Sequence, residues 1–484
     1  MRIAAPLWLP SAGLVVFVAV AAAVTGASYA LISYWADDTR LVPIAAAALV
    51  ALGIGLWRLE YGLALLILVT PFTENASINN PGEAKLRFAL ILWAVALVGL
   101  QSGRVLLTEH RLAWPAMSGG AAAFLVAALL AVGVAADGQE AMSKFLLLLG
   151  SVVVYLLIGL FLLDWGRVRP LLLAFLAVGS ITAVHALYQY VTGDLSEVGF
   201  VNSSGTIEYR VASFFPHPNQ LAGFLALFVP LGFGLFRVFD HRLVKAGSLL
   251  LIVLATLGVM ATYSRGGLLA LAALALLYAR HRRAWPAIAV ALALILWFAP
   301  SVWNDRLANT SKVDRPEIAT RIDLWGAAGE MFQQHPAVGV GLNNFQGGYI
   351  SLERSGRSFL PGTSFGVPET AHNLYLNTLA EQGLVGAAAL LLLILSAGRM
   401  IFALRRAADA RTRAMGEALL GVGVVLLVHN LFDVTFLDSK TSTIVWALFG
   451  IGAALRGSQA GREAAERDPP LTDVGGRRAP TLWT

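Results

Sequence analysis

The sequence contains no cysteine and few charged residues. None of its 484 residues is Cys, and Lys, Arg, Asp and Glu together make up 13% of the chain. The lack of cysteine excludes a disulfide framework, a thiolate metal site and a thiol nucleophile. A soluble domain carries about 25% charged residues. With 57% hydrophobic residues and a mean hydropathy of +0.71, this chain has the composition of a polytopic membrane protein.

The signatures of several common chemistries are missing as well. The glycine pair Gly339 and Gly341 has no parallel-sheet context around it, so it does not indicate a nucleotide site. No helical His-Glu-x-x-His or His-x-His spacing indicates a metal. The net charge of +6 comes mostly from short inter-helix loops and the C-terminal segment. Membrane topology explains that charge better than a nucleic-acid partner does. We expect no cofactor, no metal and no nucleic acid.

Long hydrophobic runs are what the sequence has in abundance. A membrane span needs about 20 apolar residues, and fewer where short helices pack inside a bundle. The first run is too long for a signal peptide and lacks a cleavage site. The chain predicts an all-α, polytopic membrane helix bundle of about 12–14 transmembrane helices. The predicted spans lie near residues 12–34, 41–57, 61–73, 86–101, 113–136, 144–164, 169–191, 217–237, 244–262, 265–281, 284–300, 384–404, 413–435 and 440–456.

Lys and Arg gather in alternate loops, which orients the bundle with both termini in the cytoplasm. Residues 1–300 form the first part of the bundle, with an outer loop at 192–216. Residues 301–383 form a mainly helical extracytoplasmic loop domain, and 384–456 complete the bundle. The charged segment 457–484 is predicted to be a disordered cytoplasmic tail.

Strongly polar residues concentrate at the predicted outer ends of the helices, whereas the inner half of the bundle has almost none. Polar groups at membrane depth are costly and usually mark a site. Ion-coupled transporters generally place them near the midplane. A one-sided polar cap instead favours an enzyme that acts on a lipid head group at the outer surface. The cap contains His185, Tyr188, Gln189, His217, Asn219, Gln220, Tyr263, Ser264, Arg265, His429, Asn430 and Asp433.

Three arginines near this cap are candidate phosphate ligands, because a guanidinium presents a planar fork of donors. Arg210 precedes a helix predicted to start near Pro218, whose N-terminal amides would also face an anion. Alternatively, Arg210 extends to lipid phosphates. Arg265 lies in a glycine-rich turn, where a purely structural role is equally plausible on the sequence. Arg321 follows a predicted N-cap at Thr320, and an arginine in a first helical turn is unfavourable unless an anion is near.

His372 is the candidate base. It follows a Pro- and Gly-rich stretch, lies at the predicted junction between the loop domain and the membrane, and has Glu369 and Asn373 beside it. An ordinary histidine has a pKa near 6.5 and can take a proton from a hydroxyl close to neutral pH. A lone histidine is more often a structural hydrogen-bonding residue, but the position of this one favours function.

Four blocks of residues, in this order and spacing, resemble the bacterial O-antigen ligase/polymerase superfamily over roughly residues 200–435. The first holds Arg210 and a His-Pro-Asn-Gln run, and the second is a Ser-Arg-Gly-Gly turn. The third runs from Thr320 through a His-Pro-Ala-Val-Gly-Val-Gly sequence, and the fourth begins at His372. The blocks are Arg210 with Phe215-Pro216-His217-Pro218-Asn219-Gln220-Leu221-Ala222-Gly223; Ser264-Arg265-Gly266-Gly267; Thr320-Arg321-Ile322-Asp323-Leu324-Trp325 with His335-Pro336-Ala337-Val338-Gly339-Val340-Gly341; and His372-Asn373-Leu374-Tyr375-Leu376 with Ala380-Glu381-Gln382-Gly383-Leu384.

The resemblance implies a bundle-type glycosyltransferase of the bacterial inner membrane, with many spans and an active site facing the periplasm. Such enzymes pass a glycan whole from undecaprenyl diphosphate to an acceptor hydroxyl, with inversion and without a nucleotide sugar or metal. By this analogy Arg210, Arg265 and Arg321 bind the diphosphate and His372 activates the acceptor. Asp433 falls in the last outer region, where ligases often carry an acid. The supporting residues would be His217, Asn219, Asn373, Tyr375 and Asp433.

Several functions stay open at this point. The acceptor could be lipid A-core, as in a ligase, or another lipid-linked glycan, as in a polymerase. A protein hydroxyl is the least favoured, because the protein-transferring members usually carry a further C-terminal domain. From a different class, the chain could be a lipid-linked glycan flippase or exporter without transferase activity. A flippase would be expected to have polar groups deep in the bundle and on both sides.

Overall fold

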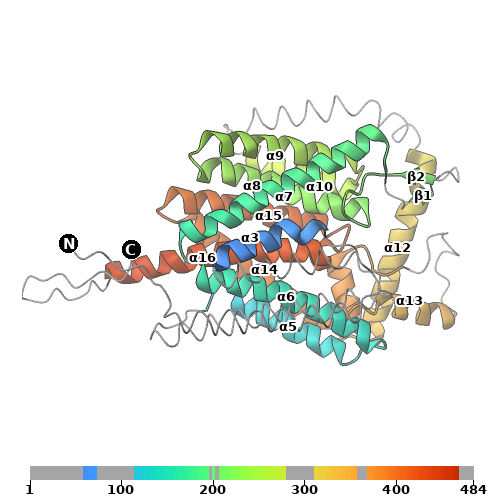
Figure 1. The fold of residues 1–484 in the computed structure, drawn as a ribbon. Coiled ribbons are helices and arrows are strands. Elements are labelled where there is room, and N and C mark those ends of the chain that lie inside the picture. The colour runs from blue at the N-terminus through green and yellow to red at the C-terminus, as the bar shows by residue number, and fades with distance from the viewer. Residues whose placement is uncertain are drawn as a thin grey trace, which may run out of the picture.

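The computed structural model describes residues 58–72, 114–195, 199–201, 207–279, 310–356 and 368–467. Helices dominate this part of the chain, which confirms the all-α prediction. Those of the bundle run roughly alongside one another, whereas α12 runs across one end (Figure 1). The α-helices are α3 (Leu59–Val69), α5 (Ser118–Val132), α6 (Gly138–Phe161), α7 (Trp165–Thr192), α8 (Pro218–Val238), α9 (Arg242–Ala261), α10 (Arg265–Ala279), α12 (Thr310–Gln334), α13 (Phe345–Arg354), α14 (Leu374–Arg405), α15 (Ala410–His429) and α16 (Ser439–Arg467), with short 3-10 helices η1 (Thr70–Phe72) and η3 (Thr435–Leu437).

Six of the described helices are long and apolar enough to cross a membrane: α6, α7, α8, α9, α14 and α15. Three shorter apolar helices, α3, α5 and α10, correspond to further predicted spans. These findings confirm a polytopic helical membrane protein. The predicted spans at 12–34, 41–57, 86–101 and 284–300 lie outside the described residues, so the total of about 12–14 stays a prediction.

Helix α8 lies at the centre of the bundle and is buried along most of its length. It packs on α9 and α15, while α16 packs on α6. Small residues let the backbones approach closely, as is common where helices meet in membranes. A Cβ added at Gly234 would overlap Ala418, and one added at Gly450 would lie 2.9 Å from Ile158.

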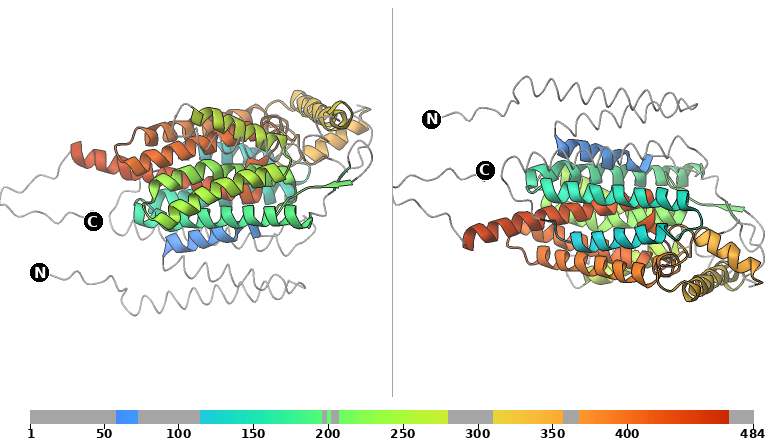
Figure 2. Two further views of the ribbon diagram at one scale, coloured as in Figure 1. Left: turned by 90° about the horizontal axis from the view of Figure 1, so that it is seen from above. Right: turned by 90° about the horizontal axis from the view of Figure 1, so that it is seen from below.

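The buried ionisable residues are distributed unevenly. Glu60, at the start of α3, pairs with Arg58 at 3.4 Å. The other buried His, Lys, Asp and Glu side chains among the described residues lie within α14, at the end of α15, in the turn after it and at the start of α16: Glu381, His429, Asp433 and Lys440. Helices α12 and α13 and the strand pair lie at one end of the bundle, and the C-terminal end of α16 projects from the opposite end (Figures 1 and 2). We call the end that bears α12 and α13 the capped end.

Two short antiparallel strands lie within the predicted outer loop 192–216. Strand β1 (Gly199–Val201) pairs with β2 (Ile207–Tyr209), with Phe200 opposite Glu208. They are the only strands among the described residues, and they project from the capped end (Figure 1).

Helices α12 and α13 have a small core of their own, separate from that of the bundle. Leu324, Met331, Phe345 and Tyr349 pack together with Ala371 and other small residues near the start of α14. The prediction that Thr320 caps a helix is wrong: α12 begins at Thr310 and Thr320 lies in its interior. Hydrophobic spacing located the helix but not its start, and the dipole argument for Arg321 no longer applies.

Helix α14 is broken at Gly383, whose φ of 60° and ψ of −155° are not helical. A break leaves backbone donors and acceptors without helical partners, which is costly away from water. The segment 336–341 supplies those partners. The N–H groups of Val340 and Gly341 donate to the carbonyls of Ala380 and Glu381 before the break, at 2.9 and 3.1 Å.

After the break, the N–H groups of Leu384 and Val385 donate to the carbonyls of Pro336 and Ala337, at 2.8 and 3.1 Å. The His-Pro-Ala-Val-Gly-Val-Gly sequence is therefore the structural complement of the break. The domain boundary predicted at 383–384 falls at this position, although the division into domains stays a prediction. At the other end, α16 continues to Arg467, so helix extends into the segment predicted to be a disordered tail.

Gly383→Ala is expected to destabilise the protein. Its backbone lies in a region that is nearly exclusive to glycine, and an added Cβ would overlap the carbonyl of Ala337. Such strain costs about 1–3 kcal/mol, so the apparent Tm in detergent should fall. Gly398→Ala in the same helix meets nothing within 4 Å and should be neutral or slightly stabilising. Equal melting curves for the two variants would contradict this account of the break.

Candidate active site

His372 lies on a short non-helical segment that leads from the loop domain into α14. Its φ of 45° is left-handed, an uncommon conformation for a residue with a side chain. Its side chain is 42% exposed. Strained backbone of this kind persists only where the surrounding structure holds it in place.

Asn373 is one of the groups that hold this segment. It is the N-cap of α14, and its Oδ1 accepts the N–H groups of Tyr375 and Leu376 at 3.0 and 3.1 Å. Its Nδ2 donates to the carbonyl of Leu431 at 3.0 Å. The N–H of Leu374 donates to the carbonyls of residues 430 and 433, at 2.9 and 3.1 Å. The start of α14 is thereby fastened to the turn that follows α15.

These hydrogen bonds bring His372 close to Asp433, although the two residues are far apart in the sequence. Nδ1 of His372 lies 3.7 Å from Oδ1 of Asp433, whose side chain is only 6% exposed. Burial by itself would raise the pKa of Asp433. The nearby imidazoles of His372 and His429, together with the Val434 N–H, outweigh burial and hold the pKa of Asp433 below its ordinary value. The site therefore holds an ionised carboxylate beside an accessible imidazole.

His429 lies behind this pair and is fully enclosed. Its Nδ1 is 3.1 Å from Oγ1 of Thr435. Gly223 of α8 makes room for the ring, since a Cβ there would lie 2.8 Å from it. Gly266 of α10 also lies near the ring, where a Cβ would make an ordinary contact at 3.7 Å. His429 thus lies where α8, α10 and α15 meet the turn that carries Asp433.

His217 faces the same centre from the start of α8, where it is the N-cap residue. Although the residue is exposed overall, its ring lies against enough protein for desolvation to lower its pKa. Asp433 and Glu369 oppose that shift, and His372 adds to it. His217 is therefore within electrostatic range of His372 and Asp433. Asn219, in the first turn of α8, is half-buried.

Arg321 reaches the site from the loop domain. Its Nη1 donates to the carbonyl of Phe432, next to Asp433, at 3.1 Å. Arg265 is the first residue of α10 and is exposed. The following residue, Gly266, packs against Phe432. Arg321 therefore contacts the turn that carries Asp433, and Arg265 begins the helix that packs against it. That the two arginines share one anion stays a prediction.

Arg210 is half-buried at the start of the segment that leads from β2 to His217. Several bonds hold this segment. The N–H of Ser213 donates to Oε1 of Gln189 at 2.7 Å, and its hydroxyl lies 3.0 Å from Nδ1 of His185. The ammonium of Lys440 donates to the carbonyl of Phe214. The segment is rigid where it approaches α8, but a role for Arg210 in the site stays a prediction.

Tyr375 points along the bundle instead of toward His372. Its hydroxyl donates to the carbonyl of Leu427 at 2.9 Å. Together with Asn373, it ties α14 to α15. The bonds of both side chains are to backbone groups, and their support of the site stays a prediction.

Three buried residues at this end were not predicted to have a role from the sequence. Lys440 is buried, donates to the carbonyl of Pro71 at 3.1 Å as well as to Phe214, and lies over the Phe215 ring. The sequence feature that could have drawn attention to Lys440 is its place at the outer end of a predicted span, because lysines are uncommon on the outer side of the membrane. Asn377 and Glu381 are also buried. Their signal was a polar stripe that repeats every four residues from Asn373.

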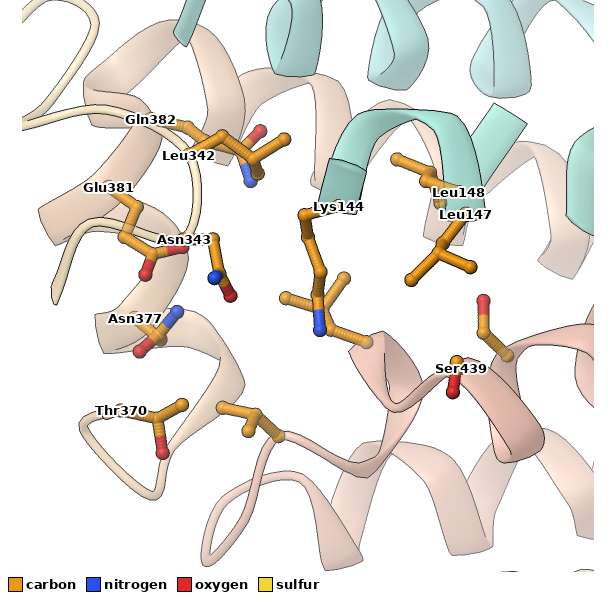
Figure 3. Close-up of a pocket in the computed structure, with 13 residues that line it drawn as sticks. Lys144, Leu147, Leu148, Leu342, Asn343, Thr370, Asn377, Glu381, Gln382 and Ser439 are labelled. Carbon is orange, nitrogen blue, oxygen red and sulfur yellow. The ribbon is translucent and has the colours of Figure 1, made fainter. Parts of the chain in front are cut away.

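A small cavity lies behind the His372 segment, between α6, α14 and α16 (Figure 3). Its volume is about 40 Å³, enough for a few water molecules. Thr370 and Val434, the near neighbours of His372 and Asp433, line one side, and the Lys144 ammonium points into it (Figure 3). Because it is too small for a sugar, the cavity is part of the support of the site.

Within the described part of the chain, no group of three or more His, Asp and Glu side chains is arranged to hold a metal ion. The expectation that no metal is needed stays a prediction. Chemically, the arrangement offers an accessible imidazole backed by a carboxylate, with guanidinium groups on the adjoining turn. Such a set can take a proton from a hydroxyl and stabilise an anionic leaving group.

Comparison with protein families gives one finding. Residues 250–391 match the family model described as O-antigen ligase, which confirms the resemblance drawn from the sequence. The match includes Arg265, Arg321 and His372, whereas Arg210 and Asp433 lie outside it. No curated protein sequence matches the chain.

The lowered pKa of Asp433 predicts a pH dependence of stability. A carboxylate that ionises more readily in the folded chain stabilises it at pH above the unfolded pKa, which is about 3.9. That contribution is lost as the pH falls through the lower folded pKa. Between about pH 6 and pH 3 the apparent Tm of the wild type should therefore fall more steeply than that of Asp433→Asn. Thermal-shift curves in detergent test this, and parallel slopes would contradict it.

Proposed function

Taking as premise that the chain carries an O-antigen ligase domain, we propose that it is an inverting glycosyltransferase. It transfers a glycan whole from undecaprenyl diphosphate to an acceptor hydroxyl at the periplasmic face of the bacterial inner membrane. The observation that carries the proposal is the approach of His372 to the buried Asp433 carboxylate, 3.7 Å away, beside the turn that Arg321 contacts.

His372 acts as the general base. With Nδ1–H directed at the Asp433 carboxylate, the neutral imidazole keeps Nε2 free to accept a proton. The 3.7 Å separation is longer than a hydrogen bond. Catalytic hydrogen bonds often shorten only once substrate is bound. The partial exposure of the ring leaves room for the acceptor hydroxyl.

The arginines bind the diphosphate and stabilise it as it leaves. The acceptor oxygen bonds to the anomeric carbon as its proton passes to Nε2 of His372, and the bond from that carbon to the phosphate oxygen breaks. One displacement of this kind inverts the anomeric configuration. The leaving diphosphate takes the electron pair, and charge on its oxygens is offset by Arg321, Arg265 and Arg210. No nucleotide is needed, because the donor bond already stores the free energy.

The acceptor is a lipid A-core in the ligase form of this proposal and a lipid-linked glycan in the polymerase form. The glycan products of cells that lack the protein distinguish the two forms. Loss of capped lipopolysaccharide with accumulation of long lipid-linked chains indicates a ligase. Loss of chain length with single units still attached indicates a polymerase.

A reconstituted assay tests the proposal directly. Wild-type protein in liposomes should transfer glycan from undecaprenyl diphosphate without ATP or an ion gradient, and in the presence of EDTA. His372→Ala should lower the rate about 10²–10⁴-fold, the usual contribution of a positioned base, while donor binding persists. His241→Ala, an exposed histidine before α9, is the matched control and should be fully active.

Movement of the lipid-linked glycan across the membrane without transfer would support the flippase alternative instead. Undiminished turnover by His372→Ala would remove it from the mechanism.

Arg321→Ala and Arg210→Ala should weaken binding of the lipid diphosphate, measured on purified protein. Arg→Lys should restore it only in part, because the planar fork is lost. Removing one charged hydrogen bond to phosphate typically costs about 1.5–3 kcal/mol, or about 10–150-fold in Kd. Arg354→Ala, an exposed arginine at the end of α13, is the control. Unchanged donor affinity in both variants would exclude these two arginines from the diphosphate site.

A further inference from the structure

Two buried polar residues connect the segment that bears His372 to the loop domain. Oδ1 of Asn377 accepts the N–H of Ala371, the residue before His372, at 3.0 Å. The Asn377 side chain also faces Glu381, one helical turn further along α14 (Figure 3). Asn377 is 2% exposed and Glu381 is 3% exposed, so both side chains are shielded from bulk solvent.

Glu381 in turn accepts from the loop domain. Its Oε1 receives the N–H of Phe345, the first residue of α13, at 3.2 Å. Figure 3 shows the Glu381 carboxylate near Asn377 and Asn343 at the edge of the cavity. Glu381 thus bonds to the loop domain and lies next to Asn377, which in turn bonds to the segment beside the base.

The N–H of Ala371 fixes which way the Asn377 amide points. A backbone N–H can only donate, so the amide oxygen of Asn377 faces it. The amide nitrogen then lies on the side of Glu381 (Figure 3). Were the amide reversed, two donors would meet at Ala371 and the bond would be lost.

A buried carboxylate is a costly way to join two helices. Apolar side chains would pack the same space without the cost of removing a charge from water. The nearby Lys144 ammonium offsets part of that cost. The specific result of placing an acid here is the directional bond to Ala371, adjacent to the strained backbone of His372.

We propose that Asn377 and Glu381 are positioning residues for the His372 base, and that they couple its placement to the docking of α13. The inference rests on the proposed function, since it assigns the pair to the same reaction. Neither residue touches the reacting atoms. Their effect is on how often His372 is aligned with the acceptor, and a misplacement of about 1 Å can cost about 10²-fold in rate.

The pair offers a reciprocal exchange as a test. In Glu381→Gln, the glutamine oxygen keeps the bond from Phe345, and its amide nitrogen then meets the Asn377 nitrogen. We expect the Asn377 amide to reverse and lose its bond to Ala371. In Asn377→Asp, two carboxylates face each other in a buried site and repel. Each single variant should lower kcat about 10–100-fold, while KM for the donor changes less than about twofold, because the diphosphate ligands are untouched.

The double variant Asn377→Asp/Glu381→Gln restores one negative charge and the complementary bonds. The new aspartate accepts from Ala371 and from the glutamine amide, and the glutamine oxygen accepts from Phe345. We expect kcat of the double variant to return to within about fivefold of the wild-type value. In a double-mutant cycle, this recovery would indicate strong coupling between the two residues. Thr378→Val is the control: its hydroxyl donates only to Leu374 in its own helix, and the variant should keep wild-type kcat.

Two outcomes would overturn the inference. Single variants with full kcat would show that the pair does not position the base. If kcat of the double variant stays as low as that of the single variants, the two residues act only on stability. The same holds if kcat falls in proportion to the apparent Tm and the yield of folded protein.

A density map of Glu381→Gln provides a readout that does not depend on transfer. An unchanged path of residues 371–373 in that map would also overturn the inference. Failure of the proposed function would be recognised separately, since the wild type itself would then transfer no glycan.

Discussion

The site depends on one contact between two helix ends. The first N–H of α14, on Leu374, donates to carbonyls of the turn that follows α15, and the cap residue Asn373 donates to the same turn. Helix ends leave backbone groups without partners, and at the edge of a membrane bundle those groups need protein partners. Meeting that requirement here places His372 beside Asp433, more than sixty residues apart in the chain. The juxtaposition that can support catalysis is therefore a consequence of satisfying backbone hydrogen bonds.

The same constraint explains why a glycine-rich loop crosses a broken helix. At Gly383 the chain of α14 changes direction, and the segment 336–341 supplies donors before the break and acceptors after it. A close approach is required: Cβ atoms at Gly339 and Gly383 would overlap the opposing backbone. Because α12 precedes this segment and α13 follows it, the loop domain is held against the start of α14. Arg321, on α12, is carried to the Phe432 carbonyl by that attachment.

Hydrophobic runs and the position of charged residues predicted the fold class and located most of the described bundle helices, because burial in a bilayer leaves strong periodic and length signals. They also indicated that Arg265, Arg321, His372 and Asp433 share one end of the bundle. The start of α12 was misplaced, since a polar helix outside the bundle has no such length signal. The hydrogen bond between Asn377 and Ala371 could not be predicted from the sequence, because it depends on how the segment before α14 folds back onto that helix.

The distribution of buried charge bears on what this site can do. Among the described residues, Glu381, His429, Asp433 and Lys440 are enclosed at the capped end, and only Glu60 is buried elsewhere. A carrier that alternates access needs polar groups that a substrate can reach from both sides. Here most of the enclosed charges instead anchor backbone: Lys440 holds Phe214, Glu381 holds Phe345, and Asp433 receives the N–H of Val434. Charges committed to fixed backbone partners favour a rigid, one-sided centre, because each would have to break those bonds to move. That rigidity is what a preorganised transferase requires and what a moving carrier would have to give up.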